Sequence, residues 1–103
     1  MTLAGLKTLL ETTKYSVAYQ SFPESDVPDM PFICFAEVGS DNFAADGKVY
    51  LPVKVVEVQL FTKKKDTTAE AAVESALQDL YWTKECEYIE DELCHRIVYS
   101  IEF

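Results

Sequence analysis

The longest apolar stretch of the chain changes the phase of its alternation partway, and this limits what the chain can fold into. The stretch runs over residues 48–63 and is typical of one long strand. Its apolar residues form two alternating sets, one for each face: Val49, Leu51, Val53 and Val55, then Val56, Val58 and Leu60. Strand side chains alternate with period two, so the change of phase predicts a bulge or bend near residues 54–56. Pro52, which cannot donate a ladder hydrogen bond, lies just before it. We therefore predict that the first half projects as one arm of a long hairpin and that the second half returns to the core sheet.

Two other segments have the apolar spacing of helices. Leucines at helical spacing predict a helix over residues 2–13, with Thr2 as its N-cap. A second helix is predicted from Thr67 to Leu80, and Thr67 with Glu70 fits a capping box. Its apolar residues follow the i, i+3, i+4, i+7 pattern, and half of them are alanine: Ala69, Ala72, Val73, Ala76, Leu77 and Leu80. This small-residue face predicts close packing on a sheet, with Tyr81-Trp82 as an aromatic anchor at the end.

The remaining strands complete one α+β domain over residues 1–103. We predict strands at 15–22, 32–38, 84–89 and 94–103, the last two as a hairpin closed by an acidic turn. Residues 23–31 contain three prolines and are predicted to lie outside the sheet, and residues 39–47 are predicted as a loop ending in an Asp-Gly turn. The predicted order is α-β-β-β-α-β-β, with two helices packed on a mostly antiparallel sheet and a projecting β-hairpin.

Composition and charge restrict the classes of function. The 103 residues are 49% hydrophobic, which suits one domain with a core. A net charge of −9 argues against binding of the phosphate backbone of nucleic acids and favours a basic protein partner or a surface that repels DNA. No apolar run is long enough to cross a membrane, and the N-terminus lacks the features of a secretory signal, so we expect a cytoplasmic site of synthesis and no membrane partner.

Residues with catalytic or metal-binding potential are sparse. Cys34, Cys86 and Cys94 have neither zinc-site nor disulfide-framework spacing and are predicted as free thiols, although Cys86 and Cys94 can face each other across the last hairpin. The single histidine, His95, is predicted to lie at the surface or in an interface, and a Cys86–His95 pair across the hairpin is a weaker alternative. The carboxylates lie in predicted loops without EF-hand spacing, and the glycines form no phosphate-binding loop. We expect no enzyme activity, no cofactor and no metal site.

The features that remain concern surfaces. The predicted hairpin carries apolar residues that have no core of their own to enter: Phe43, Val49, Tyr50, Leu51 and Pro52. Such residues either fold back or are buried against another chain. The charged residues form one basic cluster, Lys63, Lys64 and Lys65, and two acidic groups: Glu24, Asp26 and Asp29, and Glu90, Asp91 and Glu92.

Six segments carry a resemblance to a known family over nearly the whole chain: TLAGLKTLL, VAYQSFPESDVPDMPFICF, NFAADGKVYLP, VQLFTKKKD, AEAAVESALQDLYW and IVYSIEF. They resemble the tail terminator (tail completion) proteins of long-tailed bacteriophages and of prophages in low-GC Gram-positive bacteria. The resemblance implies a structural virion protein that forms a ring, typically a hexamer, at the head-proximal end of the tail tube. Such a ring ends tail growth and joins the tube to the head connector, with DNA only as passing cargo.

The resemblance and the surface features together suggest roles for these residues. Phe43 to Pro52 would form the intersubunit hairpin, and Lys63 to Lys65 would pair with acidic groups of a neighbouring ring or tube subunit. The two acidic groups would face the channel or the connector. Two alternatives stay open: a head-closure or head–tail adaptor protein, and an acidic DNA mimic that inhibits a host nucleic-acid enzyme.

Overall fold

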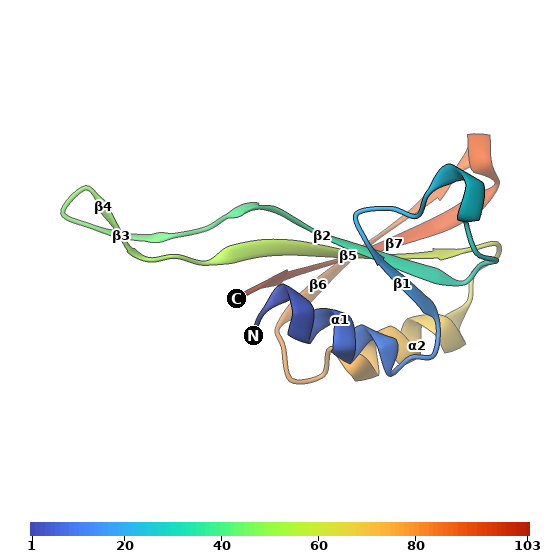
Figure 1. Ribbon diagram of the computed structural model, residues 1–103, viewed down its shortest axis with the longest axis horizontal. Coiled ribbons are helices and arrows are strands. Elements are labelled where there is room, and N and C mark those ends of the chain that lie inside the picture. The colour runs from blue at the N-terminus through green and yellow to red at the C-terminus, as the bar shows by residue number, and fades with distance from the viewer.

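A five-stranded sheet carries both helices on one face and extends at one end into a long two-stranded arm (Figure 1). The computed structural model describes residues 1–103. In chain order the elements are α1 (Leu3–Glu11), β1 (Ser16–Tyr19), η1 (Glu24–Asp26), β2 (Phe32–Ser40), β3 (Phe43–Ala45), β4 (Lys48–Leu51), β5 (Lys54–Thr62), α2 (Thr67–Ala76), β6 (Trp82–Ile89), η2 (Glu90–Glu92) and β7 (Cys94–Glu102). The strand order is β1-β2-β5-β7-β6, and only β1–β2 is parallel. The predicted α+β class and mostly antiparallel sheet are confirmed.

Helix α1 begins as the sequence predicts. The Thr2 side chain accepts a 3.0 Å hydrogen bond from the amide of Gly5, which satisfies one of the free N–H groups at the helix start. Leu6 and Leu10, one helical turn apart, are fully buried against the sheet. The helix therefore docks through a narrow leucine face.

Helix α2 differs from the prediction at both ends. The N-cap is Asp66, whose Oδ1 accepts from the amide of Ala69 at 3.0 Å, and Thr67 is the first helical residue. The predicted Thr67–Glu70 capping box is wrong, because Glu70 turns inward to bind lysines instead. The helix ends at Ala76 rather than at Leu80, since the chain turns at Leu77 to bring the next strand onto the sheet. Only one residue of the predicted Tyr81-Trp82 anchor packs on the domain: Trp82 lies against the core, whereas Tyr81 is 86% exposed.

The long strand predicted over residues 48–63 is two strands, β4 and β5, separated at Pro52–Val53. From Val56 to Thr62 every even-numbered residue of β5 is buried, and Val56, Val58 and Leu60 are fully buried. The predicted bulge lies on the partner strand: the register between β2 and β5 shifts between Glu37 and Gly39. The change of phase in the sequence thus marks the end of the arm and the start of the core sheet.

Two smaller differences concern the remaining strands. Strand β1 is shorter than the predicted 15–22, because Gln20 adopts a left-handed φ of 68° that turns the chain. The predicted loop 39–47 contains strand β3 and the end of β2. Residues 23–31 lie outside the sheet, and the final hairpin β6–β7 forms, both as predicted.

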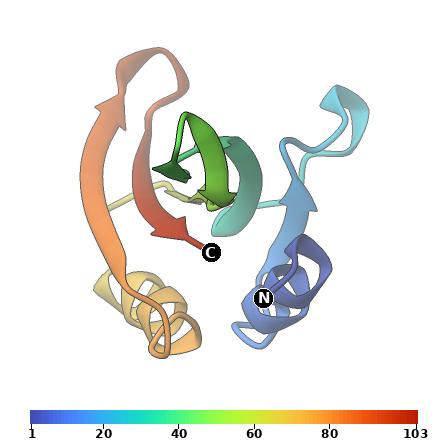
Figure 2. The same ribbon diagram turned by 90° about the vertical axis from the view of Figure 1, so that its left-hand side faces the viewer.

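The core lies between the sheet and the two helices. Its 13 buried residues come from both helices and from the interior strands β2, β5 and β7. Tyr99, on β7, is the largest fully buried side chain, and the ring of Trp82 meets it edge-on at 5.5 Å. The opposite face of the sheet, here called the helix-free face, carries no helix. Figure 2 shows two loops rising beside it, the segment after β1 on one side and the β6–β7 turn on the other.

Candidate assembly surfaces

The arm, defined as residues 40–54, extends the molecule to 48 Å along its longest axis, against 27 and 24 Å across (Figure 1). Every residue of β3 and β4 is exposed. Phe43 is 63% exposed and Tyr50 is 78% exposed, with Val49 and Leu51 exposed by more than half. Pro52 is exposed as well. The predicted projecting hairpin is confirmed, and its apolar side chains do not fold back onto the domain.

Two features fix the shape of the arm. At its base the Asp41 amide donates to the Val53 carbonyl, and the Val53 amide donates to Oδ1 of Asn42, both at 2.9 Å. At its tip Asp46 and Gly47 have φ values of 53° and 73°. Two successive positive φ angles are those of a type I′ turn, which matches the right-handed twist of the flanking strands. The Asp-Gly turn predicted from the sequence is confirmed.

The net charge lies entirely outside the arm. Within residues 40–54, Asp41 and Asp46 are balanced by Lys48 and Lys54. The net charge of −9 therefore belongs to the rest of the chain. The arm can therefore approach another acidic copy without a net repulsion.

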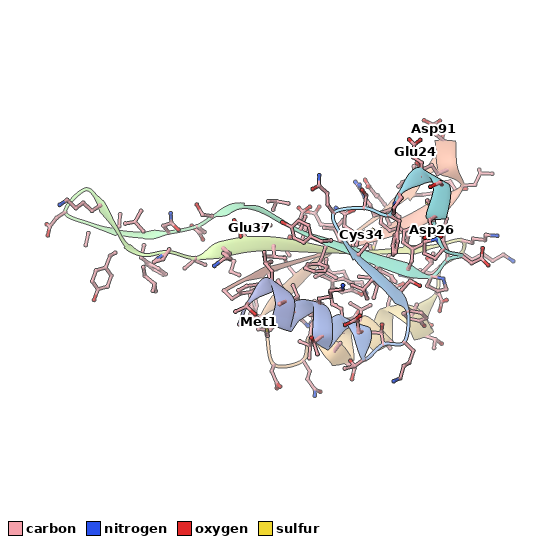
Figure 3. All side chains as sticks on the ribbon, viewed as in Figure 1. Met1, Glu24, Asp26, Cys34, Glu37 and Asp91 are labelled. Atoms are coloured by element: carbon pink, nitrogen blue, oxygen red, sulfur yellow. The ribbon has the colours of Figure 1, made fainter.

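The two acidic groups lie at the end of the molecule away from the arm. Glu24 and Asp26 are on η1, and Asp91 is on η2, at the end of the β6–β7 hairpin (Figure 3). All six acids, Glu24, Asp26, Asp29, Glu90, Asp91 and Glu92, are exposed. The two groups are more than 60 residues apart in sequence, and the fold brings them to opposite sides of the helix-free face (Figure 2).

The three lysines are not equivalent. They lie in the turn between β5 and α2, and Nζ of Lys65 is 2.8 Å from Oε2 of Glu70. Nζ of Lys84 lies 2.6 Å from the other oxygen of Glu70. Burial raises the pKa of Glu70, but hydrogen bonds from Lys65 and Lys84 outweigh burial and leave the pKa lowered. Lys65 is thus engaged within the chain, and only Lys63 and Lys64 are left for a partner.

A hollow on the helix-free face was not anticipated from the sequence. Its volume is about 350 Å³, and it is lined mostly by apolar side chains, here called the aromatic hollow: Phe22, Val27, Met30, Phe32, Phe61 and Ile89. Phe32 stacks on Phe61 with ring centroids 5.0 Å apart, and Phe22 meets Phe32 edge-on at 5.3 Å. The apolar residues that lie among the prolines and acids of residues 22–31 could have indicated this hollow, because the predicted fold gave them no place in the core.

Arg96 lies at the edge of this hollow and is only partly bonded. It is on β7, opposite Phe61 on β5 and Glu87 on β6. One terminal nitrogen, Nη2, forms an ion pair with Glu87. Its Nε atom is buried and has no hydrogen-bond partner. A buried donor without an acceptor costs free energy, so the guanidinium of Arg96 is not fully satisfied within the chain.

The fold does not place the cysteine and histidine pairs considered from the sequence directly opposite each other. The register places Tyr88 opposite His95 and Ile97 opposite Cys86, so neither the Cys86–His95 pair nor the Cys86–Cys94 pair lies directly across the hairpin. The three cysteines are free thiols. No three His, Cys, Asp or Glu side chains gather as a possible metal site. Neither helix has the length and hydropathy needed to span a membrane.

Comparison with known proteins gives a fold relationship. No family model and no curated protein matches the chain. Among solved structures, a chain of the "Virion of native gene transfer agent (GTA) particle" aligns with a TM-score of 0.58 and 16% sequence identity. The alignment covers 96% of this chain and 82% of that chain. At this identity the likeness concerns the fold: the α+β arrangement is one that a virion component also uses.

Proposed function

We propose that this protein is a structural virion protein that forms a ring at the head-proximal end of a phage tail tube, ends tail growth and joins the tail to the head. The exposed apolar arm carries this proposal. Phe43, Val49, Tyr50 and Leu51 are presented to solvent on a hairpin with a defined turn and base. An exposed apolar surface of this kind is typical of a site that another chain covers.

Two further observations support the proposal. The fold matches that of a chain in a virion particle over nearly the full length of this protein. The charge distribution suits contact with copies and passage of DNA, since the arm is neutral and the rest of the chain carries the net charge of −9. Acidic groups beside a channel repel the phosphates of DNA and so let it pass without binding. In this role Glu24, Asp26, Asp29, Glu90, Asp91 and Glu92 face the channel or the connector.

The exposed lysines supply the contact with the next layer of the tail. Lys63 and Lys64 make no ion pair within the chain. The turn that carries them, between β5 and α2, lies at the end opposite the arm (Figure 1). Surface lysines contribute to the rate and specificity of docking more than to affinity. We assign them to acidic groups of the tail tube protein or of a neighbouring ring subunit.

Native mass spectrometry and negative-stain electron microscopy of the purified protein test ring formation. The expected result is a closed oligomer, with six subunits as the expected number, and an open channel. A protein that stays a stable monomer or dimer contradicts the proposal and favours the acidic DNA mimic.

A second experiment tests the role at the tail. Purified protein is added to tail tube protein that is elongating in vitro. The expected result is tubes that stop growing and carry a ring at one end. Binding to a head connector without any effect on tube growth would favour the head–tail adaptor instead.

A further inference from the structure

The arm and the aromatic hollow lie at opposite ends of the same molecule (Figure 1). The arm leaves the sheet beyond Ser40 and Lys54, whereas the hollow lies between the segment after β1 and the β6–β7 turn. The arm is built on the sheet and points away from the hollow, so it cannot enter the hollow of its own chain. Any chain that fills the hollow must come from another molecule.

The hollow suits an aromatic side chain of the arm in size and chemistry. Its volume of about 350 Å³ lies at the small end of the range in which proteins bury whole ligands, roughly 300–1,000 Å³. The stacked rings of Phe32 and Phe61 form its floor. Tyr50, with 78% of its surface exposed, is the most exposed apolar side chain of the arm. Aromatic side chains that fill pockets of this kind dominate the energetics of many interfaces.

The unpaired donor of Arg96 points to the same occupant. Arg96 lines the hollow, and its buried Nε has no acceptor within the chain. A purely apolar occupant would give this guanidinium no acceptor, whereas the phenol oxygen of a tyrosine can accept from one of its N–H groups. Among the exposed apolar residues of the arm, only Tyr50 has a side chain that combines a large apolar ring with an acceptor at its end.

Charge permits the arm of a second copy to approach the hollow. Glu92 lines the hollow, and Glu24, Asp26, Glu90 and Asp91 lie on the η1 and η2 segments beside it. The arm is neutral and is not repelled by this rim, unlike the acidic segments of a second copy. The turn of Lys63 to Lys65 is attracted by the rim as well, but it offers no aromatic side chain to fill the hollow. Lys48, two residues from Tyr50, adds a cation that can lie against the rim.

We propose that the aromatic hollow of one copy receives the arm of a second copy, with Tyr50 among the phenylalanines and its phenol oxygen accepting from the guanidinium of Arg96. This inference rests on the proposed self-assembly and adds the surface that the arm binds. Because the arm and the hollow are different surfaces, the contact is heterologous and repeats head to tail. It forms a closed ring when the rotation per subunit allows closure.

Two pairs of variants test the two halves of the contact. Tyr50→Ser removes the inserted ring, and Tyr81→Ser, at an equally exposed tyrosine outside the arm and the hollow, is its control. Val27→Asp places a charge in the hollow, and Ala71→Asp adds the same charge on the exposed side of α2. All four positions are exposed, so circular dichroism should show a folded protein in each case. We expect Tyr50→Ser and Val27→Asp to raise the dissociation constant of self-association by roughly 30-fold or more, and the controls to leave it unchanged.

Mixing the two variants is the decisive measurement. Tyr50→Ser has an intact hollow and Val27→Asp has an intact arm, so an equimolar mixture should form a 1:1 heterodimer in native mass spectrometry that cannot grow further. Absence of this heterodimer overturns the proposal. If Tyr50→Ser is monomeric but Val27→Asp forms the wild-type ring, the arm binds a surface other than the hollow. In that case this inference fails, whereas ring formation through the arm stands. If the wild-type protein itself never associates, the proposed function fails with it.

Discussion

The phenol hydroxyl of Tyr99 donates a 2.8 Å hydrogen bond to Oε2 of Glu74 and so links the centre of the sheet to helix α2. Nζ of Lys84, on the edge strand β6, lies 2.8 Å from the same oxygen. Lys84 also contacts Glu70, which in turn binds Lys65. Helix α2 is thus held on the sheet by a connected polar network as well as by its apolar face.

Tyr99→Phe should destabilise the protein by about 1–2 kcal/mol, because it removes one hydrogen bond to a charged acceptor. The loss stays in this range because Glu74 keeps its contact with Lys84. Urea unfolding followed by circular dichroism measures the change. Tyr88→Phe removes a hydroxyl from a half-exposed tyrosine and is the matched control, with an expected change below about 0.5 kcal/mol. Equal losses in both variants would contradict a special role for the Tyr99 hydroxyl.

Stability should fall as the pH rises through the alkaline range. Burial and the hydrogen bond to Glu74 raise the pKa of Tyr99 far above its usual value. Above about pH 10 the unfolded chain releases this proton and the folded chain keeps it, so stability decreases by about 1.4 kcal/mol per pH unit from this group. The raised pKa values of Cys34, Cys94 and Lys84 act in the same direction. Urea unfolding between pH 8 and 11 should show a shallower decrease for Tyr99→Phe; equal slopes would contradict the assignment.

The sequence predicted the elements whose signals are local. Thr2 as a cap, the Asp46-Gly47 turn and the alternation of β5 depend on neighbouring residues alone, and all three are confirmed. The predicted N-cap of α2 was wrong, because Asp66 and Thr67 are neighbours and both belong to residue types that favour the N-cap position. The choice between them depends on Glu70, which the fold engages with Lys84, 14 residues away in sequence.

The arm could be predicted, but the aromatic hollow could not. The arm has a sequence signal of its own, a change of phase followed by exposed apolar residues. The hollow combines Phe22, Phe32, Phe61 and Ile89 from four separate segments, and their meeting depends on the strand order β1-β2-β5-β7-β6. Strand order is set by packing of the whole sheet, which residue spacing does not specify.

The corrected cap of α2 can be tested directly. Asp66→Ala removes the side-chain acceptor for the Ala69 amide and should cost about 1 kcal/mol of stability. Thr67→Ala replaces the first helical residue by a better helix former and should be neutral or slightly stabilising. Thermal or urea unfolding of the two variants measures the difference. A larger loss for Thr67→Ala than for Asp66→Ala would restore the capping box predicted from the sequence.

Two carboxyl groups meet where the arm joins the sheet. Glu102 is exposed, but local desolvation beside Asp41, with a hydrogen bond and the like charge of Asp41, raises the pKa of Glu102. A carboxyl whose pKa is raised on folding stabilises the fold less as the pH rises through that pKa, so the pair is unfavourable at neutral pH. Asp41→Asn should therefore raise the melting temperature at pH 7 and lower the pKa of Glu102 in an NMR titration. The gain should shrink as the pH falls, because protonation of Glu102 removes the repulsion; a gain that is independent of pH would contradict this cause.

A substitution in the turn at the tip of the arm distinguishes effects on self-association from effects on the stability of the domain. Gly47 has a φ of 73°, and a Cβ at this position meets no atom within 4 Å, so Gly47→Ala introduces backbone strain without a steric clash. The arm contributes none of the 13 core residues, so the melting temperature should change little. A strained turn disfavours the type I′ conformation and misaligns Val49 and Tyr50 on the adjacent strand, so self-association should weaken. Gly39→Ala is the control, since Gly39 also has open space but no positive φ. Sedimentation velocity compares the two variants, and equal association of Gly47→Ala and wild type would show that the ordered arm is not the docking element.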